Sequence, residues 1–306
     1  MKKLKILITG GAGYLGSILT TKLVDMGHFV TVIDLMEFNK ISLSHLFLKS
    51  NFKFINGDVR NKDLIKKEIK NKNFIIPLAA LVGAPLCKKF PKKTIDVNYK
   101  SIEFILSLIK DKQKIIYPNT NSGYGIGKKN SFCDEKSPLN PISLYGKTKV
   151  DAEKIILNHK NSVVFRLATV FGYSFRMRTD LLVNFLVNKA VQEKKINLFE
   201  PHFRRNYIHV LDVANAFIFA IKNFNKMKGN IFNVGLSNAN LTKLQLARLI
   251  KKNVKGTKLN FLKNRKDPDK RDYFVSNNKI EKLGFKPSVS IEKGIIELKN
   301  IYSLYN

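Results

Sequence analysis

The stretch Lys5-Ile-Leu-Ile-Thr-Gly-Gly-Ala-Gly-Tyr-Leu-Gly16 decides the fold of this chain. Its first five residues form a short apolar run, as in a strand buried within a parallel sheet. Glycines follow at Gly10, Gly13 and Gly16, and apolar residues then recur with helical spacing as far as Gly27. This order predicts a dinucleotide-binding turn, because glycines permit a tight turn and the close approach of a pyrophosphate. The first helical N–H groups, those of Tyr14 and Leu15, are expected to bind the phosphates.

Apolar runs of the same kind recur along the first half of the chain and alternate with helical stretches. They are Phe29–Ile33, Phe52–Ile55, Phe74–Ile76, Lys114–Tyr117 and Val163–Phe165. Such alternation is typical of a doubly wound parallel sheet with helices on both faces. We therefore predict an α/β protein with a dinucleotide-binding Rossmann domain at residues 1–170.

The pattern becomes irregular beyond about residue 170. Helices are expected over Arg178–Val191 and from Thr242 to about Lys252, with short strands at Ile196–Phe199 and Ile231–Val234. We predict that residues 171–306 form a smaller α/β substrate domain over the carboxyl edge of the sheet, where open α/β sheets bind ligands. Residues 206–224 are expected to return to the first domain.

Composition limits the classes of function. The net charge is +32, but 46 of the 55 basic residues are lysines spread along the chain. Specific nucleic-acid recognition relies more on arginine, so we predict no specific nucleic-acid partner. No apolar run is long enough to span a membrane. The two cysteines, Cys87 and Cys133, do not form a disulfide framework or a zinc-binding pattern, so no metal is expected and a cytoplasmic location is favoured.

Acidic and small residues after the next strands complete the predicted nucleotide site. Asp34 ends the second strand, where a carboxylate accepts hydrogen bonds from the adenosine ribose and repels a 2′-phosphate, so NAD is expected rather than NADP. Asp58 and Val59 follow the third strand and could meet the adenine; a helix N-cap is the alternative for Asp58. The small residues of Leu78-Ala79-Ala80 would let the cofactor lie close to the backbone.

A second group of residues predicts alcohol–ketone redox chemistry. Tyr145 and Lys149 are four apart and so share one face of a helix. An ammonium beside a phenol favours the phenolate, which can take a proton from an alcohol, so we expect Lys149 to lower the pKa of Tyr145. Thr120 follows the fifth strand and could bind the substrate oxygen. Asn98 could support the cofactor site through water or backbone.

Together these residues resemble the extended short-chain dehydrogenase/reductase family of nucleotide-sugar enzymes. The similarity runs the length of the chain and includes Arg166–Gly172 and Arg205–Val210. It implies a nucleotide-sugar site in residues 171–306, and a homodimer or higher oligomer paired through the helices that bear Asn98 and Tyr145. Phe104 and Leu108 are expected at that interface. The candidate substrate-binding residues are Val82, Gly83, Asn119, Asn121, Arg176, Arg178, Arg205 and Arg271.

Four segments resemble a narrower group in that family, which oxidises C4 of a GDP-activated heptose for bacterial capsules. They are Ile76–Cys87, Tyr117–Gly127, His202–Val210 and Asp267–Tyr273. This resemblance implies a GDP-sugar substrate, tightly held NAD, and a 2-oxoacid such as 2-oxoglutarate as electron acceptor.

The residues after Thr120 help to choose among the other reactions that the family catalyses. Dehydratases of the family carry Asp-Glu there, whereas this chain has Asn121-Ser122, which supplies no acid/base pair for removing water. A 4-epimerase that recycles its NAD internally stays open. A regulatory protein that senses NAD without turnover is a further alternative, although such proteins typically lose the Tyr/Lys pair.

Overall fold

A seven-stranded sheet forms the centre of the computed structural model, which describes residues 2–127, 131–262 and 271–304. Across the sheet the strands are β11 (Asn230–Val234), β7 (Ser162–Leu167), β5 (Lys114–Thr120), β4 (Phe74–Pro77), β1 (Lys5–Thr9), β2 (Phe29–Asp34) and β3 (Phe52–Asn56). Every neighbouring pair is parallel. The chain order reverses between β1 and β4, which opens a crevice at their carboxyl ends.

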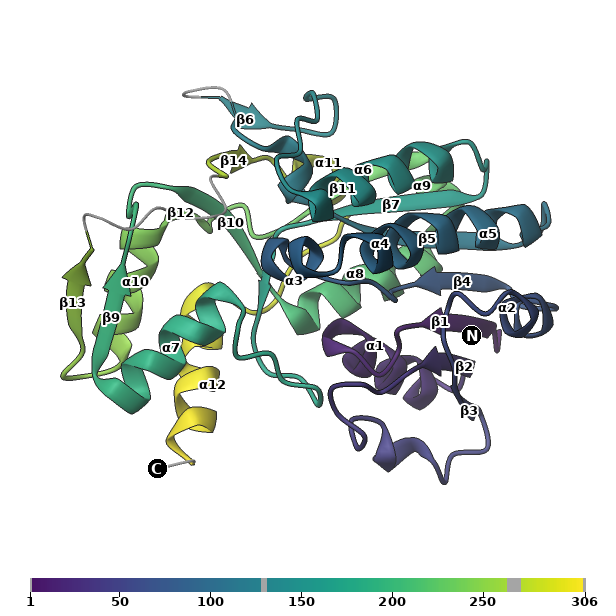
Figure 1. The fold of residues 1–306 in the computed structure, drawn as a ribbon, viewed down its shortest axis with the longest axis horizontal. Helices are drawn as coiled ribbons and strands as arrows, with labels where there is room; N and C mark the ends of the chain where they lie inside the picture. The colour runs from purple at the N-terminus through teal and green to yellow at the C-terminus, as the bar shows by residue number, and fades with distance from the viewer. Residues whose placement is uncertain (1, 128–130, 263–270, 305–306) are drawn as a thin grey trace.

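Helices cover both faces of this sheet (Figure 1). They are α1 (Tyr14–Asp25), α2 (Lys62–Glu68), α3 (Ala84–Lys89), α4 (Pro91–Ile95), α5 (Ser101–Leu108), α6 (Leu144–Leu157), α8 (Val210–Lys222) and α9 (Phe224–Met227). Alternate residues of one strand enter opposite cores, as the pleat requires: Ile6 and Ile8 pack with α1 and α8, and Leu7 packs on the other face. The predicted α/β fold with a doubly wound parallel sheet is confirmed.

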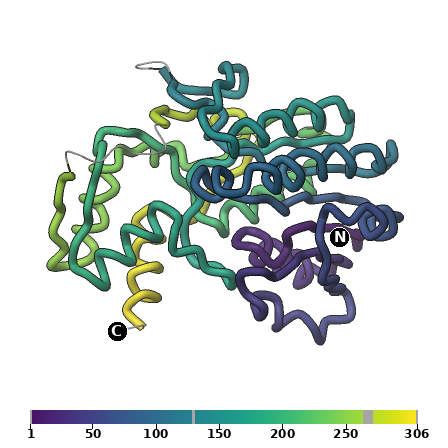
Figure 2. Tube along the Cα trace, viewed as in Figure 1, coloured from purple at the N-terminus to yellow at the C-terminus, as the bar shows by residue number. Residues whose placement is uncertain are grey.

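The remaining elements form small sheets and helices beside the main sheet. The strands are β8 (Thr169–Phe171), β10 (Arg204–His209) and β12 (Asn240–Thr242) in one sheet, β9 (Lys195–Leu198) with β13 (Lys258–Phe261), and β6 (Phe132–Cys133) with β14 (Phe274–Val275). The helices are α7 (Leu182–Glu193), α10 (Lys243–Asn253), α11 (Asn278–Glu281) and α12 (Ile291–Ser303). Figure 2 shows the yellow C-terminal helix beside α7, with which it shares an apolar core. Short turns of helix lie at Ser44–Leu46 (η1), Asp96–Lys100 (η2, a π-turn) and Asn121–Tyr124 (η3).

Two local expectations were wrong. The strand at Ile231–Val234 was placed in the smaller domain, but β11 pairs with β7 at the edge of the main sheet. The helix expected from Arg178 begins at Leu182, and Arg178 and Asp180 form an ion pair in the preceding loop. Phe104 and Leu108 are partly buried against the core between α2 and α5. Their place at an interface, and the homodimer itself, stay predictions.

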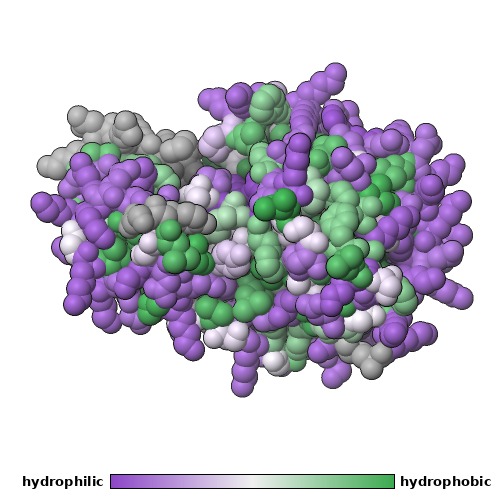
Figure 3. Space-filling view, turned by 90° about the horizontal axis from the view of Figure 1, so that it is seen from below, coloured by the Kyte–Doolittle hydropathy of each residue, from purple (hydrophilic) through white to green (hydrophobic). Residues whose placement is uncertain are grey.

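The surface agrees with the spread of lysines along the sequence. On the face drawn in Figure 3, hydrophilic residues cover both sides of the molecule and more apolar residues lie between them. Within the described ranges no helix has the length and apolar character needed to cross a membrane.

Candidate active site

The glycine loop between β1 and α1 has the shape of a phosphate cradle. Gly10 has a φ of +74°, and a Cβ there would lie 2.4 Å from the backbone nitrogen of Ala79; a Cβ on Gly16 would lie 2.3 Å from the Gly10 oxygen. A Cβ on Gly13 would meet only the Gly10 oxygen, at 3.1 Å. Protein packing thus accounts for Gly10 and Gly16, whereas the space beside Gly13 suits a ligand. The first turn of α1 has neither an acidic residue nor a side-chain cap, so its N–H groups suit a diphosphate.

Asp34 lies at the end of β2, beside this loop. Its two carboxylate oxygens accept hydrogen bonds from the backbone N–H groups of Ala12, at 2.9 Å, and Met36, at 2.8 Å. Burial raises the pKa of Asp34, and these two donors oppose that rise. The carboxylate therefore fixes the turn, and it stands where a ribose would approach in this fold.

Asp58 does not cap the following helix. Its carboxylate binds Arg60, with Nη2 at 2.6 Å, and this hydrogen bond lowers the pKa of Asp58. The N-cap of α2 is Asn61, which accepts from the Leu64 N–H at 3.1 Å, so the alternative reading of Asp58 was wrong. Val59 is buried in the core under β2 and β3. The contact of Asp58 and Val59 with adenine stays a prediction.

Tyr14 and Leu15 carry their side chains away from the loop. The Tyr14 hydroxyl donates to the Gly172 carbonyl at 2.6 Å and accepts from Asn184 at 3.3 Å, so it ties α1 to the segment after β8. Leu15 packs against the main core. Any contact of Tyr14 and Leu15 with a cofactor is therefore predicted to be made by their backbone N–H groups.

Asn98 acts on the backbone after β4. In the π-turn η2 its side chain accepts from the Leu81 N–H at 2.8 Å and donates to the Leu81 carbonyl at 2.9 Å. This pair of bonds fixes the strand exit that contains Leu78, Ala79 and Ala80 and leads to Val82 and Gly83. Gly83 has a φ of +97°, which lets the chain turn into α3. Asn98 thus supports the predicted cofactor site through the backbone.

The structure brings Thr120 and Tyr145 together. Thr120 ends β5, and Tyr145 lies in the first turn of α6, where Ser143 accepts the Gly146 N–H as N-cap. A hydrogen bond between the Thr120 and Tyr145 side chains favours the phenolate of Tyr145. The Thr120 hydroxyl also lies 2.8 Å from the Ser122 hydroxyl. A substrate hydroxyl at this point would face both a proton acceptor and a second hydrogen-bonding group.

The expected lowering of the Tyr145 pKa by Lys149 was wrong. Burial raises the pKa of Tyr145 to about 12, and the cations that oppose this rise are Arg271 and Arg178. Burial lowers the pKa of Lys149 to about 7, while the carboxylate of Glu153 acts in the opposite direction. The Lys149 ammonium lies 3.9 Å from the centre of the Tyr117 ring. Desolvation therefore dominates the pKa of both groups.

The four candidate arginines occupy different positions. Arg271 donates to the Ser122 hydroxyl, and Arg178 pairs with Asp180 near Tyr145. Arg176 lies 4.5 Å from the Phe38 ring on the Asp34 side of the molecule. Arg205 is 3% exposed and donates to the Arg204 carbonyl at 2.9 Å. Arg271 and Arg178 thus act on Tyr145, and diphosphate binding by any of the four stays a prediction. Residues 267–270 of the Asp267–Tyr273 motif lie outside the described residues.

The two asparagines beside Thr120 differ in their partners. Asn119 is buried; its amide donates to Glu153 and its oxygen accepts from the Thr120 N–H at 2.8 Å. Asn121 is 1% exposed, and neither polar atom of its side chain has a hydrogen-bond partner in the described chain. Such a group costs free energy unless a ligand or water satisfies it, so Asn121 fits a substrate contact better than Asn119 does.

Sequence reasoning missed Glu153 as part of this site and named Arg166 only within the segment Arg166–Gly172. The two residues form a buried ion pair at 2.6 Å behind the predicted catalytic residues. A signal was present for Glu153, which follows Lys149 by four residues and so shares its helix face. The pairing of Arg166 with Glu153 could not be predicted this way because β7 reaches the site only through the sheet. No metal site of three or more His, Cys, Asp or Glu occurs among the described residues.

This arrangement joins a Rossmann fold to a site where the predicted catalytic residues Thr120 and Tyr145 meet. The chain belongs to the NAD dependent epimerase/dehydratase family, which matches residues 6–235. It is therefore an NAD-dependent enzyme that acts on a nucleotide sugar. The glycine cradle and Asp34 fit this cofactor.

Known relatives differ in the reaction their names describe. A CDP-paratose 2-epimerase of Salmonella typhi is 29% identical, with 81% of this chain and 83% of that protein covered. The mouse dTDP-D-glucose 4,6-dehydratase is 25% identical, with 95% and 86% covered. The structure of UDP-glucuronic acid 4-epimerase from Bacillus cereus, in complex with UDP-glucuronic acid and NAD, has a TM-score of 0.86 at 25% identity, with 99% and 100% covered. These comparisons indicate the family and not one reaction within it.

Proposed function

We propose that this enzyme oxidises the C4 hydroxyl of a GDP-activated sugar to a ketone and releases the 4-keto sugar. The substrate that fits its sequence resemblance best is GDP-D-glycero-α-D-manno-heptose, so the activity would be that of a GDP-D-glycero-α-D-manno-heptose 4-dehydrogenase. The observation that carries the proposal is the environment of Thr120. The hydroxyl of Ser122 lies between Thr120 and Arg271, and Asn121 is a buried amide.

These groups support oxidation without loss of water. Elimination from C5 and C6 needs an acid and a base beside the substrate. Asn121 and Ser122 occupy the positions where family dehydratases carry a carboxylate pair, and Ser122 contacts a guanidinium. The guanidinium of Arg271 beside Ser122 supplies no general base for that elimination. Asn121 and Ser122 therefore do not supply the acid and the base that dehydration needs.

In the proposed reaction the chain's residues bind the alcohol and move its proton. Thr120 orients the C4 hydroxyl, and Tyr145 accepts the hydroxyl proton while Arg271 and Arg178 favour the phenolate. Bound NAD would accept the hydride from C4. A 2-oxoacid such as 2-oxoglutarate would then accept this hydride from NADH, together with one proton, and become the 2-hydroxyacid. Arg271 offers a cation for such a carboxylate beside the hydroxyls that would bind its ketone.

Several features of the protein belong to the same proposal. Residues 1–170 and 206–224 would bind NAD, and residues 171–306 would bind the nucleotide sugar. The diphosphate would be bound by Arg176, Arg178, Arg205 and Arg271, a choice supported by the affinity of guanidinium for phosphate. We also propose a homodimer and a cytoplasmic location. The two free, buried cysteines, Cys87 and Cys133, support a reducing compartment.

A 4-epimerase is the second candidate. It would use the same Thr120, Tyr145 and Lys149, and the 25% identity to UDP-glucuronic acid 4-epimerase across 99% of this chain favours it. The two reactions differ in where the hydride goes after oxidation, since an epimerase returns it to the opposite face of the same sugar. An NAD-sensing regulator is disfavoured by the intact Tyr145–Lys149 pair.

The test incubates purified protein with GDP-heptose, GDP-mannose or UDP-glucose, with and without 2-oxoglutarate, and identifies products by mass and NMR. A 4-keto sugar formed in step with 2-hydroxyglutarate, and lost in Tyr145→Phe, supports the dehydrogenase. Recovery of only the C4 epimer would establish the second candidate instead. Binding of NAD with no turnover of any sugar, together with unchanged binding in Tyr145→Phe, would indicate the regulator.

A further inference from the structure

A buried carboxylate lies behind the catalytic residues. Glu153 is 3% exposed and follows Lys149 by one turn of α6. Its two oxygens face Arg166 of β7, with Nη2 at 2.6 Å and Nε at 3.1 Å, which is a two-pronged ion pair. Burying two charges costs desolvation free energy that an apolar pair would not incur. A contribution to stability therefore does not by itself explain why Glu153 and Arg166 are buried as an ion pair.

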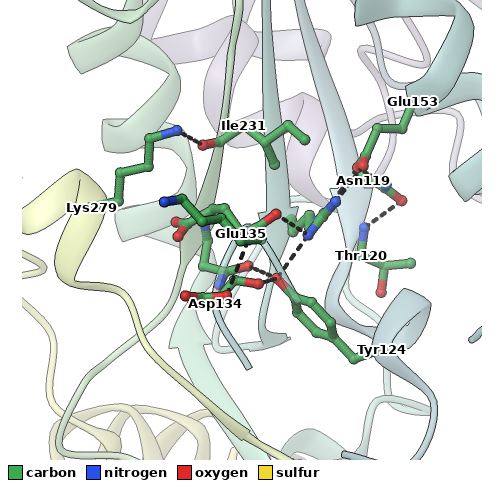
Figure 4. A network of polar contacts seen from close by, with 11 residues as sticks. Asn119, Thr120, Tyr124, Asp134, Glu135, Glu153, Ile231 and Lys279 are labelled. Carbon is green, nitrogen blue, oxygen red and sulfur yellow. Dashed lines mark hydrogen bonds and ion pairs between the residues drawn. The ribbon is translucent and has the colours of Figure 1, made fainter. Parts of the chain in front are cut away.

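Glu153 is also connected to the catalytic threonine. One of its oxygens accepts from the Asn119 amide, and the Asn119 oxygen accepts from the backbone N–H of Thr120 at 2.8 Å. Figure 4 shows Glu153, Asn119 and Thr120 in succession along this path. The carboxylate thus sets the Asn119 amide orientation, and that orientation sets the end of β5 from which the Thr120 hydroxyl projects.

The far side of the ion pair is fixed by further partners. Arg166 Nη1 donates to the Tyr124 hydroxyl at 3.0 Å and to the Glu135 carbonyl at 3.2 Å. The Tyr124 hydroxyl donates in turn to the Asn233 side-chain oxygen at 2.7 Å. Figure 4 shows Tyr124 and Glu135 in the same network as Glu153 and Asn119. With these partners Arg166 has little freedom to rotate, so Glu153 is held in one position.

Lys149 is the other catalytic group within reach of this carboxylate. The groups that act on or contact Lys149 are Glu153 on α6 and Tyr117 on β5, and Arg166 on β7 pairs with Glu153. Cys87 on α3, Arg178 and Arg271 act on Tyr145. Among these, Glu153 supplies the negative charge that favours the ammonium form of Lys149.

We propose that Glu153 is a positioning residue for two catalytic groups at once. Through Asn119 it fixes Thr120, and through its charge it favours the ammonium form of Lys149, one turn away on the same helix. This inference rests on the catalytic roles proposed above for Thr120 and Lys149. Glu153 does not touch the reacting atoms.

The test compares Glu153→Gln with Asn119→Ala and with Asp151→Asn, which removes an exposed carboxylate from the same helix. The titration of Lys149 is followed by NMR of lysine labelled at the ε-carbon, with the signal assigned by its loss in Lys149→Arg. We expect Glu153→Gln to move this titration about one unit to lower pH. It should also lower kcat about tenfold at a slightly alkaline pH, with a smaller change in KM.

Asn119→Ala separates the two effects and keeps the ion pair. It should lower kcat by about tenfold and leave the Lys149 titration in place. Asp151→Asn should change neither quantity. A Glu153→Gln enzyme that folds, by thermal melting, with an unmoved Lys149 titration would overturn the charge effect, and full kcat in Asn119→Ala would overturn the effect on Thr120.

The lysine titration also separates this inference from the proposed function. If the wild-type protein oxidises none of the sugars, the proposed function is wrong. In that case the Lys149 signal of Glu153→Gln still decides whether the carboxylate controls the lysine charge.

Discussion

Arg271 donates a hydrogen bond to the hydroxyl of Ser122, although the two residues lie in opposite halves of the chain. Ser122 in turn lies 2.8 Å from the hydroxyl of Thr120. The contact places a cation from the segment before β14 beside the end of β5. It therefore connects the region proposed to bind the nucleotide sugar with the proposed catalytic threonine.

Replacing Arg271 by methionine should move the ascending limb of the pH–rate profile to higher pH. The Arg271 cation lowers the pKa of Tyr145, so its removal makes the phenol harder to deprotonate. We expect a shift of about half a unit or more, measured as initial rates of NADH formation across pH. Arg248→Met, which changes an exposed arginine on α10, is the matched control, and an equal shift in both variants would contradict the assignment.

Gly13→Ala should weaken NAD binding and preserve the fold. Gly13 has a φ of −74°, which alanine adopts without strain, and the added methyl meets only the Gly10 oxygen at 3.1 Å. The methyl instead occupies the space where a pyrophosphate would approach, so we expect affinity to fall by about tenfold or more. Titration calorimetry measures the affinity and thermal melting the fold.

Gly16→Ala is the matched comparison. Its methyl would lie 2.3 Å from the Gly10 oxygen and 2.7 Å from Gly11 Cα, so the backbone itself must move. A loss of about 2 kcal/mol or more in the free energy of unfolding is expected. Similar melting temperatures for the two variants would contradict this division of roles.

Tyr14→Phe should lower stability and leave NAD affinity unchanged within about twofold. The hydroxyl binds the Gly172 carbonyl at 2.6 Å in a buried setting, so its loss should cost about 1 kcal/mol. Cofactor binding by this residue is assigned to its backbone N–H, which the substitution keeps. Urea unfolding and calorimetry test the two parts, with Tyr173→Phe, an exposed tyrosine nearby, as control. A large loss of NAD affinity would show a side-chain role.

Lys149→Met should raise stability near neutral pH while abolishing turnover. The pKa of Lys149 is about 7 in the folded protein and 10.5 ordinarily, so between these values the unfolded chain binds the extra proton. The folded state consequently loses stability as pH falls from about 10.5 to about 7. Removing the amine should raise the free energy of unfolding by about 2–4 kcal/mol at about pH 7 and by much less at about pH 10.

Denaturant unfolding at the two pH values measures this difference. Lys147→Met, an exposed lysine on the same helix, serves as the control and should change stability little at either pH. A pH-independent effect of Lys149→Met would mean that the amine is not desolvated as the structure indicates.

Much of the fold was predictable because its signals are local. Each strand of the main sheet appears as an apolar run, and the turn after β1 needs Gly10 and Gly16 for backbone reasons alone. The strand Asn230–Val234 was misplaced because a short apolar run does not specify its partner. Its pairing with β7 follows from the crossover of α8 over the sheet, which no local pattern encodes.

In the candidate site, too, some features were predictable from local sequence and others depend on tertiary packing. Tyr145 and Lys149 were found from a four-residue spacing, and Asp34 from its place after a strand. The expected pKa of Tyr145 was wrong because burial depends on what the rest of the chain covers. Asn119 and Asn121 are near neighbours in sequence, yet only the packing of α6 against β5 decides which of them meets Glu153.

By itself the sequence determined the glycine loop, the Tyr145–Lys149 pair and the position of Thr120 at a strand end, because each depends on backbone conformation and helix or strand period within a few residues. Only the tertiary structure decided that Arg271 contacts Ser122 and that Glu153 pairs with Arg166 behind Lys149. Those contacts depend on the order of parallel strands and on burial. Both are set by the packing of distant segments, which also fixes the charge on each catalytic group.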